Sequence, residues 1–175
     1  MTYDVIDNFL PEYQFKQLQT AILSWKFPWY YNDMILPEHI GKELMHQYIH
    51  VLYNLNPPWH GGTQYLENSD MIINILELCG SILGATRLHR IKANTRLKTL
   101  FHRGAGYHVD IPNCSNLTTS ILYMNTNNGY TKFKKGGKVK SVENRMVVFD
   151  GNLEHQGYSC TDKLRRVLIN FNYEI

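Results

Sequence analysis

The first half of the chain carries apolar residues at the spacing of helices. Pro11 suits the first turn of a helix, and apolar residues then recur every three or four positions. These residues are Phe15, Leu18, Ala21, Ile22 and Trp25. Further along, Ser69 or Asp70 can cap another helix, which is expected to end near Gly80 or Gly84. Its apolar positions are Ile72, Ile75, Leu76 and Cys79.

The segment after Pro37 carries a similar stripe, which predicts a helix between these two. Its apolar residues are Ile40, Leu44, Tyr48, Val51, Leu52 and Leu55. His46 and His50 would then lie four residues apart on one helix face, where two histidines can bind zinc as a pair. An ordinary helix face is the favoured interpretation, because no third ligand is near in the sequence. The prolines and glycines of NPPWHGG, residues 56–62, end the segment.

From about Thr86 the pattern changes to that of strands. Short segments rich in β-branched and aromatic residues alternate with turns rich in Gly, Asn and Asp. The predicted strands are RLHRIKANTRL, GYHVDI, TTSILYMN, YTKF, KVKSV, RMVVFD and RRVLINFNYEI. Asn128-Gly129 is a strong hairpin signal between two of them. Roughly seven or eight strands at this spacing, with no helical pattern between them, indicate a sandwich or jelly roll.

Helices followed by strands predict one α+β domain with a mainly β core and the N-terminal helices packed on one sheet. Neither half is large enough to stand alone, whereas 175 residues can bury a core without disulfides. We therefore expect a single domain over 1–175, with helical support over roughly 1–85 and the β core over roughly 86–175. The aromatic residues Trp25, Trp29, Tyr30 and Tyr31 could line a substrate groove or, more simply, pack in the core.

The composition is that of a globular protein, with 43% hydrophobic and 19% charged residues. The net charge of +3 is too small to argue for nucleic-acid binding, and much of it lies in KFKKGGKVK, residues 132–140. We expect this run to be the solvated tip of a hairpin. Cys79, Cys114 and Cys160 are expected to be free thiols. With no signal peptide and no apolar run of about 20 residues, a cytoplasmic protein without a membrane partner is expected.

The stretch GYHVDIPNC, residues 106–114, places His108 and Asp110 two positions apart, on the same face of a strand. Such a pair can be a metal site, an acid/base pair or a structural feature. His155 follows the apolar strand RMVVF, and a jelly roll can bring it beside His108. Two histidines and one carboxylate are the facial triad of non-haem iron(II) oxygenases, which leaves metal positions open for a co-substrate and O₂.

A 2-oxo dicarboxylic acid as co-substrate would require a fixed cation for its far carboxylate. Guanidinium groups bind carboxylates through two parallel hydrogen bonds, and Arg165 and Arg166 open the last strand. Alternation puts Arg166 on the face of Asn170 and Asn172, and Arg165 on the apolar face. The more polar face better suits the lining of a wet pocket. Arg166 is therefore preferred, and Arg165 remains the alternative.

This ordered set of residues resembles the 2-oxoglutarate/iron(II)-dependent dioxygenases. TSILYMN (119–125) is similar to the T-x-I-x-Y-L-N strand of their prolyl 4-hydroxylase-like branch, GYTKF to the G-x-T-x-F strand, and NRMVVFDGNLEHQG to the segment that delivers the second histidine. The resemblance covers roughly residues 86–173. It implies a double-stranded β-helix (jelly roll), with Fe(II) held by His108, Asp110 and His155. It also implies that Tyr123 bonds the distal carboxylate of 2-oxoglutarate beside Arg166 or Arg165.

The activity that the resemblance implies is oxidation of a substrate C–H, with O₂ consumed and 2-oxoglutarate decarboxylated to succinate and CO₂. Ascorbate is allowed as a further cofactor. A protein or peptide prolyl side chain is the first expectation for the substrate, and a small amino-acid-like molecule the second. Asp110 argues against halogenation, because halogenating members lack that ligand. A non-catalytic metal-binding jelly roll is the alternative function. Nucleic-acid demethylation is disfavoured, since nothing basic follows Arg166 in the last strand.

Overall fold

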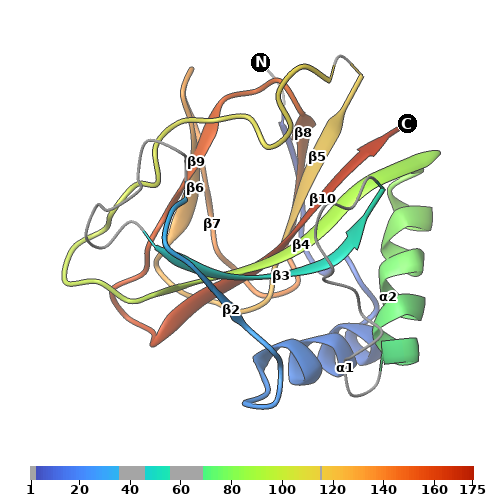
Figure 1. The fold of residues 1–175 in the computed structure, drawn as a ribbon, viewed down its shortest axis with the longest axis horizontal. Helices are drawn as coiled ribbons and strands as arrows, with labels where there is room; N and C mark the ends of the chain where they lie inside the picture. Colours follow the sequence, from blue (N-terminus) through green and yellow to red (C-terminus); the bar gives the residue numbers. More distant parts are fainter. Residues whose placement is uncertain (1–2, 36–45, 56–68, 115) are drawn as a thin grey trace.

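A computed structural model describes residues 3–35, 46–55, 69–114 and 116–175 of the chain. These residues form two helices and two antiparallel sheets (Figure 1). The larger sheet contains, from edge to edge, β1 (Tyr3–Ile6), β8 (Met146–Asp150), β5 (Thr118–Tyr123), β10 (Arg165–Glu174), β4 (Arg87–Leu97), β3 (Gln47–Asn54) and β2 (Tyr30–Asn32). The smaller sheet contains β7 (Lys138–Lys140), β6 (Tyr130–Phe133) and β9 (His155–Tyr158). The described protein is therefore mostly β, as predicted.

The two helices, α1 (Glu12–Leu23) and α2 (Ser69–Ile82), lie against one face of the seven-stranded sheet (Figure 1). Leu18 of α1 and Ile75 of α2 share a buried apolar cluster with Phe171 of β10. α1 begins directly after Pro11, and α2 is followed by Gly84 with a positive φ of 67°. Both helices were predicted at these places, because the spacing of their apolar residues and their terminal residues agree with each other.

The other face of the large sheet packs on the small sheet. Ile121 of β5 and Leu168 of β10 form a second buried cluster with Phe133 of β6 and Val139 of β7. The centre of the large sheet is therefore buried on both faces. This arrangement is consistent with the nearly continuous apolar runs in β5, TTSILY, and β8, MVVFD.

The helix predicted between α1 and α2 is wrong where the structure describes it. Residues 47–54 form strand β3, which pairs with β4, and the pairing shifts register between Val51 and Tyr53. A strand with an irregular register loses its two-residue period, so its apolar residues mimic the spacing of a helix. The earlier part of that predicted helix, with Ile40 and Leu44, lies outside the described residues.

The hairpin predicted at Asn128-Gly129 is also wrong. β5 lies in the large sheet and β6 in the small one, so the turn carries the chain from one sheet to the other. The observed hairpin of this region is formed by β6 and β7, with residues 134–138 exposed at its tip. The lysine run therefore lies on a solvated hairpin, as expected.

GYHVDI does not form a full strand, and only an isolated bridge joins His108 to His155. His155 itself begins strand β9. Cys79, Cys114 and Cys160 are free, as predicted. Within the described ranges, no helix is long and apolar enough to cross a membrane.

Candidate metal centre and pocket

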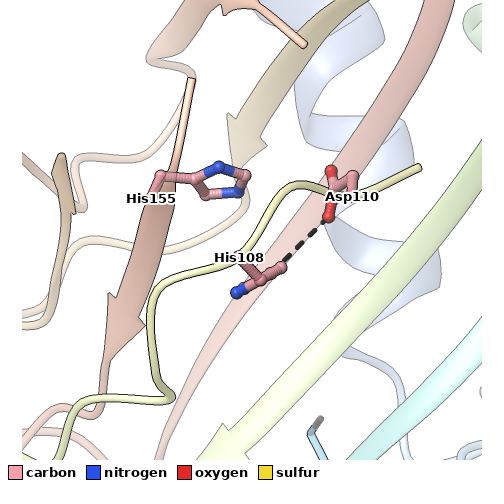
Figure 2. A group of neighbouring side chains, drawn as sticks. All are labelled: His108, Asp110 and His155. Carbon is pink, nitrogen blue, oxygen red and sulfur yellow. Dashed lines mark ion pairs between the residues drawn. The ribbon is translucent and has the colours of Figure 1, made fainter. Parts of the chain in front are cut away.

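The structure brings His108, Asp110 and His155 together (Figure 2). His155 is the first residue of β9, and His108 lies opposite it on the neighbouring segment. Two backbone hydrogen bonds of 3.0 Å, each from the amide of one histidine to the carbonyl of the other, fix this pairing. One candidate ligand atom from each of the three side chains lies within 4.8 Å of the others. The trio inferred from sequence is therefore a spatial cluster.

Both histidines have their Nδ1 atoms directed at backbone carbonyls. His108 Nδ1 lies 3.0 Å from the carbonyl of Gly106, and His155 Nδ1 lies 3.1 Å from that of Leu153. A carbonyl oxygen only accepts hydrogen bonds, so each Nδ1 must carry the proton. A neutral ring then has its lone pair on Nε2. Both imidazoles are thus set in the tautomer that a metal ligand requires.

Asp110 is held by two asparagine side chains of β10. Asn170 and Asn172 each donate an Nδ2 hydrogen bond to its Oδ2 atom, at 3.2 and 3.1 Å. Arg90 of β4 donates to the Asp110 carbonyl at 3.3 Å and lies 3.7 Å from Oδ1. These contacts fix one carboxylate oxygen and leave Oδ1 facing His108 Nε2, at 3.8 Å.

The surroundings of the cluster favour an ionised Asp110, and burial favours a neutral His155. Burial alone would raise the pKa of Asp110, but interactions with His155, Arg90, Lys92 and His108 in their protonated forms outweigh it and hold that pKa well below its usual range. Burial lowers the pKa of His155. A carboxylate and a neutral imidazole are the protonation states that bind metals.

This donor set fits a divalent first-row metal. Two imidazole nitrogens and one carboxylate oxygen suit iron(II) and leave coordination positions free for other ligands. The amide oxygen Oδ1 of Asn170 is also buried without a hydrogen-bond partner among the described residues. A water or ligand bound at the cluster would supply one.

The cluster lies in a pocket of about 370 Å³ between the two sheets. Its wall includes Arg166, Leu168 and Asn170 of β10 and Thr131 of β6. Arg90, Lys92, Asn94 and Arg96 of β4 complete one side. This volume lies at the lower end of the roughly 300–1,000 Å³ typical of small-molecule sites.

Arg166 is buried in this pocket and its orientation is fixed. Its Nε atom donates to Ser141 Oγ at 2.7 Å, and its Nη2 atom donates to Thr131 Oγ1 at 3.0 Å. Its guanidinium lies 5.4 Å from the centre of the Tyr123 ring. A Cβ atom at Gly157 would come within 3.1 Å of Nη1, so the glycine keeps space open beside this nitrogen. A side-chain hydrogen bond with Tyr123 adds to these contacts of Arg166.

Arg165 points to the other face of β10. Its Nη2 atom donates to the carbonyl of Leu23, at the end of α1, at 2.7 Å. It is not part of the pocket wall. The alternation of the last strand thus separates the two arginines, which the sequence left as alternatives.

Tyr123 is fully buried and does not line the pocket. Its hydroxyl donates to Thr131 Oγ1 at 2.8 Å, and Thr131 does line the pocket. Thr131 Oγ1 accepts from both Tyr123 and Arg166, so its own proton remains to be donated. Sequence reasoning missed Thr131, although it is the threonine of the G-x-T-x-F motif.

The polar and basic row on β4 was also missed by sequence reasoning. Arg90, Lys92, Asn94 and Arg96 occupy every second position of RLHRIKANTRL. Residues at every second position of a strand lie on one face. The shared face of these four residues could therefore have been predicted from the sequence. Burial, and secondarily the charge of Arg90, lowers the pKa of Lys92 to about 8, while Asp110 opposes this effect.

Other candidates from the sequence lie away from the pocket. His50 is on a strand rather than a helix, and its Nδ1 atom lies 2.8 Å from the Pro28 carbonyl. His46 contacts the rings of Tyr31 and Tyr48. Among the described residues, the one group of three or more metal-ligating side chains is that of His108, Asp110 and His155. The aromatic residues near the end of α1 differ in burial. Trp29 packs on the core, whereas Trp25 is 89% exposed.

Comparison with known proteins relates this geometry to solved structures. No protein-family model and no curated protein matches the sequence. A prolyl hydroxylase from Trichoplax adhaerens, solved with a hypoxia inducible factor peptide, superposes with a TM-score of 0.64 at 15% identity, covering 98% of this chain and 83% of that one. A prolyl-4-hydroxylase from Pseudomonas putida gives 0.61 at 14% identity, covering 99% and 92%.

A third similar structure is the non-haem α-ketoglutarate-dependent epimerase SnoN of nogalamycin biosynthesis. Its TM-score is 0.62 at 10% identity, covering 98% of this chain and 76% of that one. The chain therefore has the fold of the 2-oxoglutarate/iron(II) oxygenases over nearly its whole length. Hydroxylases and an epimerase share this fold, so the reaction has to be argued from the site.

Proposed function

We propose that the protein is a non-haem iron(II) and 2-oxoglutarate-dependent dioxygenase, and specifically a hydroxylase, built on a double-stranded β-helix as one domain over 1–175. One observation carries this proposal. Two histidines with free Nε2 lone pairs and an ionised carboxylate lie in the same pocket as a buried guanidinium that Ser141 and Thr131 hold in place. A metal and a dicarboxylate could occupy such a pocket together.

His108, Asp110 and His155 would hold iron(II) through Nε2, a carboxylate oxygen and Nε2. Asn170 and Asn172 keep the Asp110 carboxylate oriented, and the Gly106 and Leu153 carbonyls fix the tautomers of the histidines. Such outer contacts orient the ligands and tune their basicity. When bound, iron with 2-oxoglutarate and O₂ supplies oxidation of a substrate C–H, with release of succinate and CO₂.

Arg166 would bind the distal carboxylate of 2-oxoglutarate through Nη1, and Thr131 would donate its hydroxyl proton to the same group. Tyr123 would then act indirectly, because its hydroxyl donates to Thr131 and orients it, while Tyr123 itself does not line the pocket. The alternative, Arg165, would not take this role, because its side chain donates to the carbonyl of Leu23 at the end of α1. A charge-assisted pair in a buried site is strong and directional.

For the primary substrate, the candidates remain a prolyl side chain of a protein or peptide and a small amino-acid-like molecule. Likeness of fold to two prolyl hydroxylases supports the first. The modest volume of the pocket supports the second.

Sequential calorimetric titration tests the proposal. Mn(II), a redox-inert substitute for iron(II), is titrated into metal-free protein, and 2-oxoglutarate is added afterwards. We expect one metal per chain, and binding of 2-oxoglutarate only after the metal. His155→Ala should abolish both binding steps. Arg166→Ala should retain Mn(II) binding and weaken the binding of 2-oxoglutarate. Metal binding without any 2-oxoglutarate binding would favour the alternative of a non-catalytic metal-binding jelly roll.

A further inference from the structure

The pocket carries more positive charge than the proposed reaction uses. Arg90, Lys92, Arg96 and Arg166 all line it, and Asp110 is the one acidic side chain among the described residues of the wall. A divalent metal and the two carboxylates of 2-oxoglutarate would add equal and opposite charges. The excess of cations therefore remains after both have bound.

Three of these cations have hydrogen-bond or ion-pair partners in the structure. Arg90 contacts Asp110 and donates to Asn172 Oδ1 at 3.1 Å. Arg96 donates to the carbonyls of Arg103 and Gly157, at 3.1 and 3.0 Å. Arg166 donates to Ser141 and Thr131 and would take the distal carboxylate of 2-oxoglutarate.

Lys92 is the exception. No hydrogen bond or ion pair of its ammonium group occurs within the described residues, although it lies in the wall of a pocket between two sheets. The neighbouring Arg90 repels it, and the charge of Asp110 that favours it would be shared with a bound metal. Lys92 is half-buried in this wall. An ammonium group that faces the pocket without an ion pair among the described residues offers a charge-assisted hydrogen bond to a ligand anion.

We propose that the primary substrate is a small acid whose carboxylate or phosphate group is bound by Lys92, on the β4 side of the pocket. This inference rests on the proposed function and narrows its substrate. A pocket of about 370 Å³ that already holds 2-oxoglutarate leaves room for a small molecule. Anchoring the acid on β4, close to Asp110, presents the rest of the molecule to the metal ligands. A free amino-acid-like substrate fits this pocket better than a neutral prolyl side chain.

Fluorine NMR with Mn(II)-loaded, 2-oxoglutarate-saturated protein tests the inference. The probes are fluoroacetate for a carboxylate, monofluorophosphate for a phosphate, and fluoroacetamide as the neutral analogue of the first. Mn(II) broadens the resonance of any probe that binds near the three ligands, and Zn(II)-loaded protein gives the baseline. Saturating 2-oxoglutarate keeps Arg166 occupied, so that binding at Lys92 is observed separately.

We expect Mn(II)-dependent broadening of one anionic probe and none of fluoroacetamide. Lys92→Met should raise the Kd of that probe about tenfold or more, because a hydrogen bond to a charged group is lost. Lys92→Arg should still bind the probe. Lys140→Met, at an exposed lysine of β7, should leave the Kd of the probe unchanged. The probe that binds assigns the acid as a carboxylate or a phosphate.

Two results overturn the inference, and they are distinguishable from each other. If 2-oxoglutarate binds normally but neither anion is broadened, or Lys92→Met has no effect, the substrate is not anchored at Lys92 while the proposed function stands. If 2-oxoglutarate itself fails to bind the Mn(II) protein, the proposed function fails and this inference fails with it. An unchanged 2-oxoglutarate affinity in Lys92→Met verifies that the variant is folded.

Discussion

At the scale of single residues, the pocket depends on side chains whose freedom has been removed by their neighbours. Arg166 is held at Nε by Ser141 and at Nη2 by Thr131, and Gly157 keeps space open beside Nη1. Asp110 is held at Oδ2, which leaves Oδ1 facing His108. Preorganised groups of this kind bind a ligand without first having to be ordered, and this favours tight and specific binding.

The two arginines of β10 provide a matched pair for testing this arrangement. Arg166→Ala should raise the 2-oxoglutarate Kd of the metal-loaded protein by roughly 10- to 100-fold, the equivalent of one or two charge-assisted hydrogen bonds. Arg165→Ala should leave this Kd unchanged, because Arg165 bonds the carbonyl of Leu23 outside the pocket. Calorimetry measures both. An equal or larger effect of Arg165→Ala would contradict the assignment.

Asn172 provides a test of how the carboxylate is oriented. Asn172→Ala removes the hydrogen bonds that Asn172 donates to Asp110 Oδ2 and Thr119 Oγ1, and the one that its Oδ1 accepts from Arg90 Nε. Loss of such an outer contact should weaken Mn(II) binding by roughly 10- to 100-fold. His50→Ala, a buried histidine away from the cluster, serves as the control and should keep the metal affinity of the wild type. Unchanged affinity in Asn172→Ala would mean that Asn170 alone orients the ligand.

At the scale of elements, sequence predicted well where one signal dominated. α2 was predicted from its apolar spacing and its end residues, and β4 and β10 from segments of strand composition between turns. β3 was missed because a shift in its register disguised the two-residue period. The false hairpin at Asn128-Gly129 has another cause. A turn signal states that the chain changes direction, but it does not state which strands then pair.

Gly80 offers a prediction about α2. It lies within the helix, and a Cβ atom added there would meet nothing within 4 Å. Gly80→Ala should therefore raise the free energy of unfolding by roughly 0.5–1 kcal/mol, because alanine loses less backbone entropy in a helix. Chemical denaturation measures the change. Gly129→Ala is the contrasting variant, since its Cβ would come within 2.9 Å of the Tyr158 carbonyl oxygen and should destabilise the protein. A destabilised Gly80→Ala variant would show that the helix does not tolerate the methyl group.

At the scale of the whole molecule, the two halves of the sequence build one sheet. β1 pairs with β8 and β3 pairs with β4, so strands from the predicted helical half extend the β core on both sides. Residues of β4, β6, β9 and β10 line the site, together with residues of the segment that carries His108 and Asp110. The metal ligands could be predicted from sequence because their types and spacing identify them. The lysine on β4 could not be linked to them, because its position depends on pairing between distant strands.

The most direct test of the central claim is the visible spectrum of the protein with iron(II) and 2-oxoglutarate under anaerobic conditions. Wild-type protein should show a weak charge-transfer band that saturates with 2-oxoglutarate, since the co-substrate would chelate iron held by His108, Asp110 and His155. The band should be absent in His155→Ala. In Arg166→Ala it should require roughly 10- to 100-fold more 2-oxoglutarate. Iron binding without the band in wild-type protein would contradict the dioxygenase assignment.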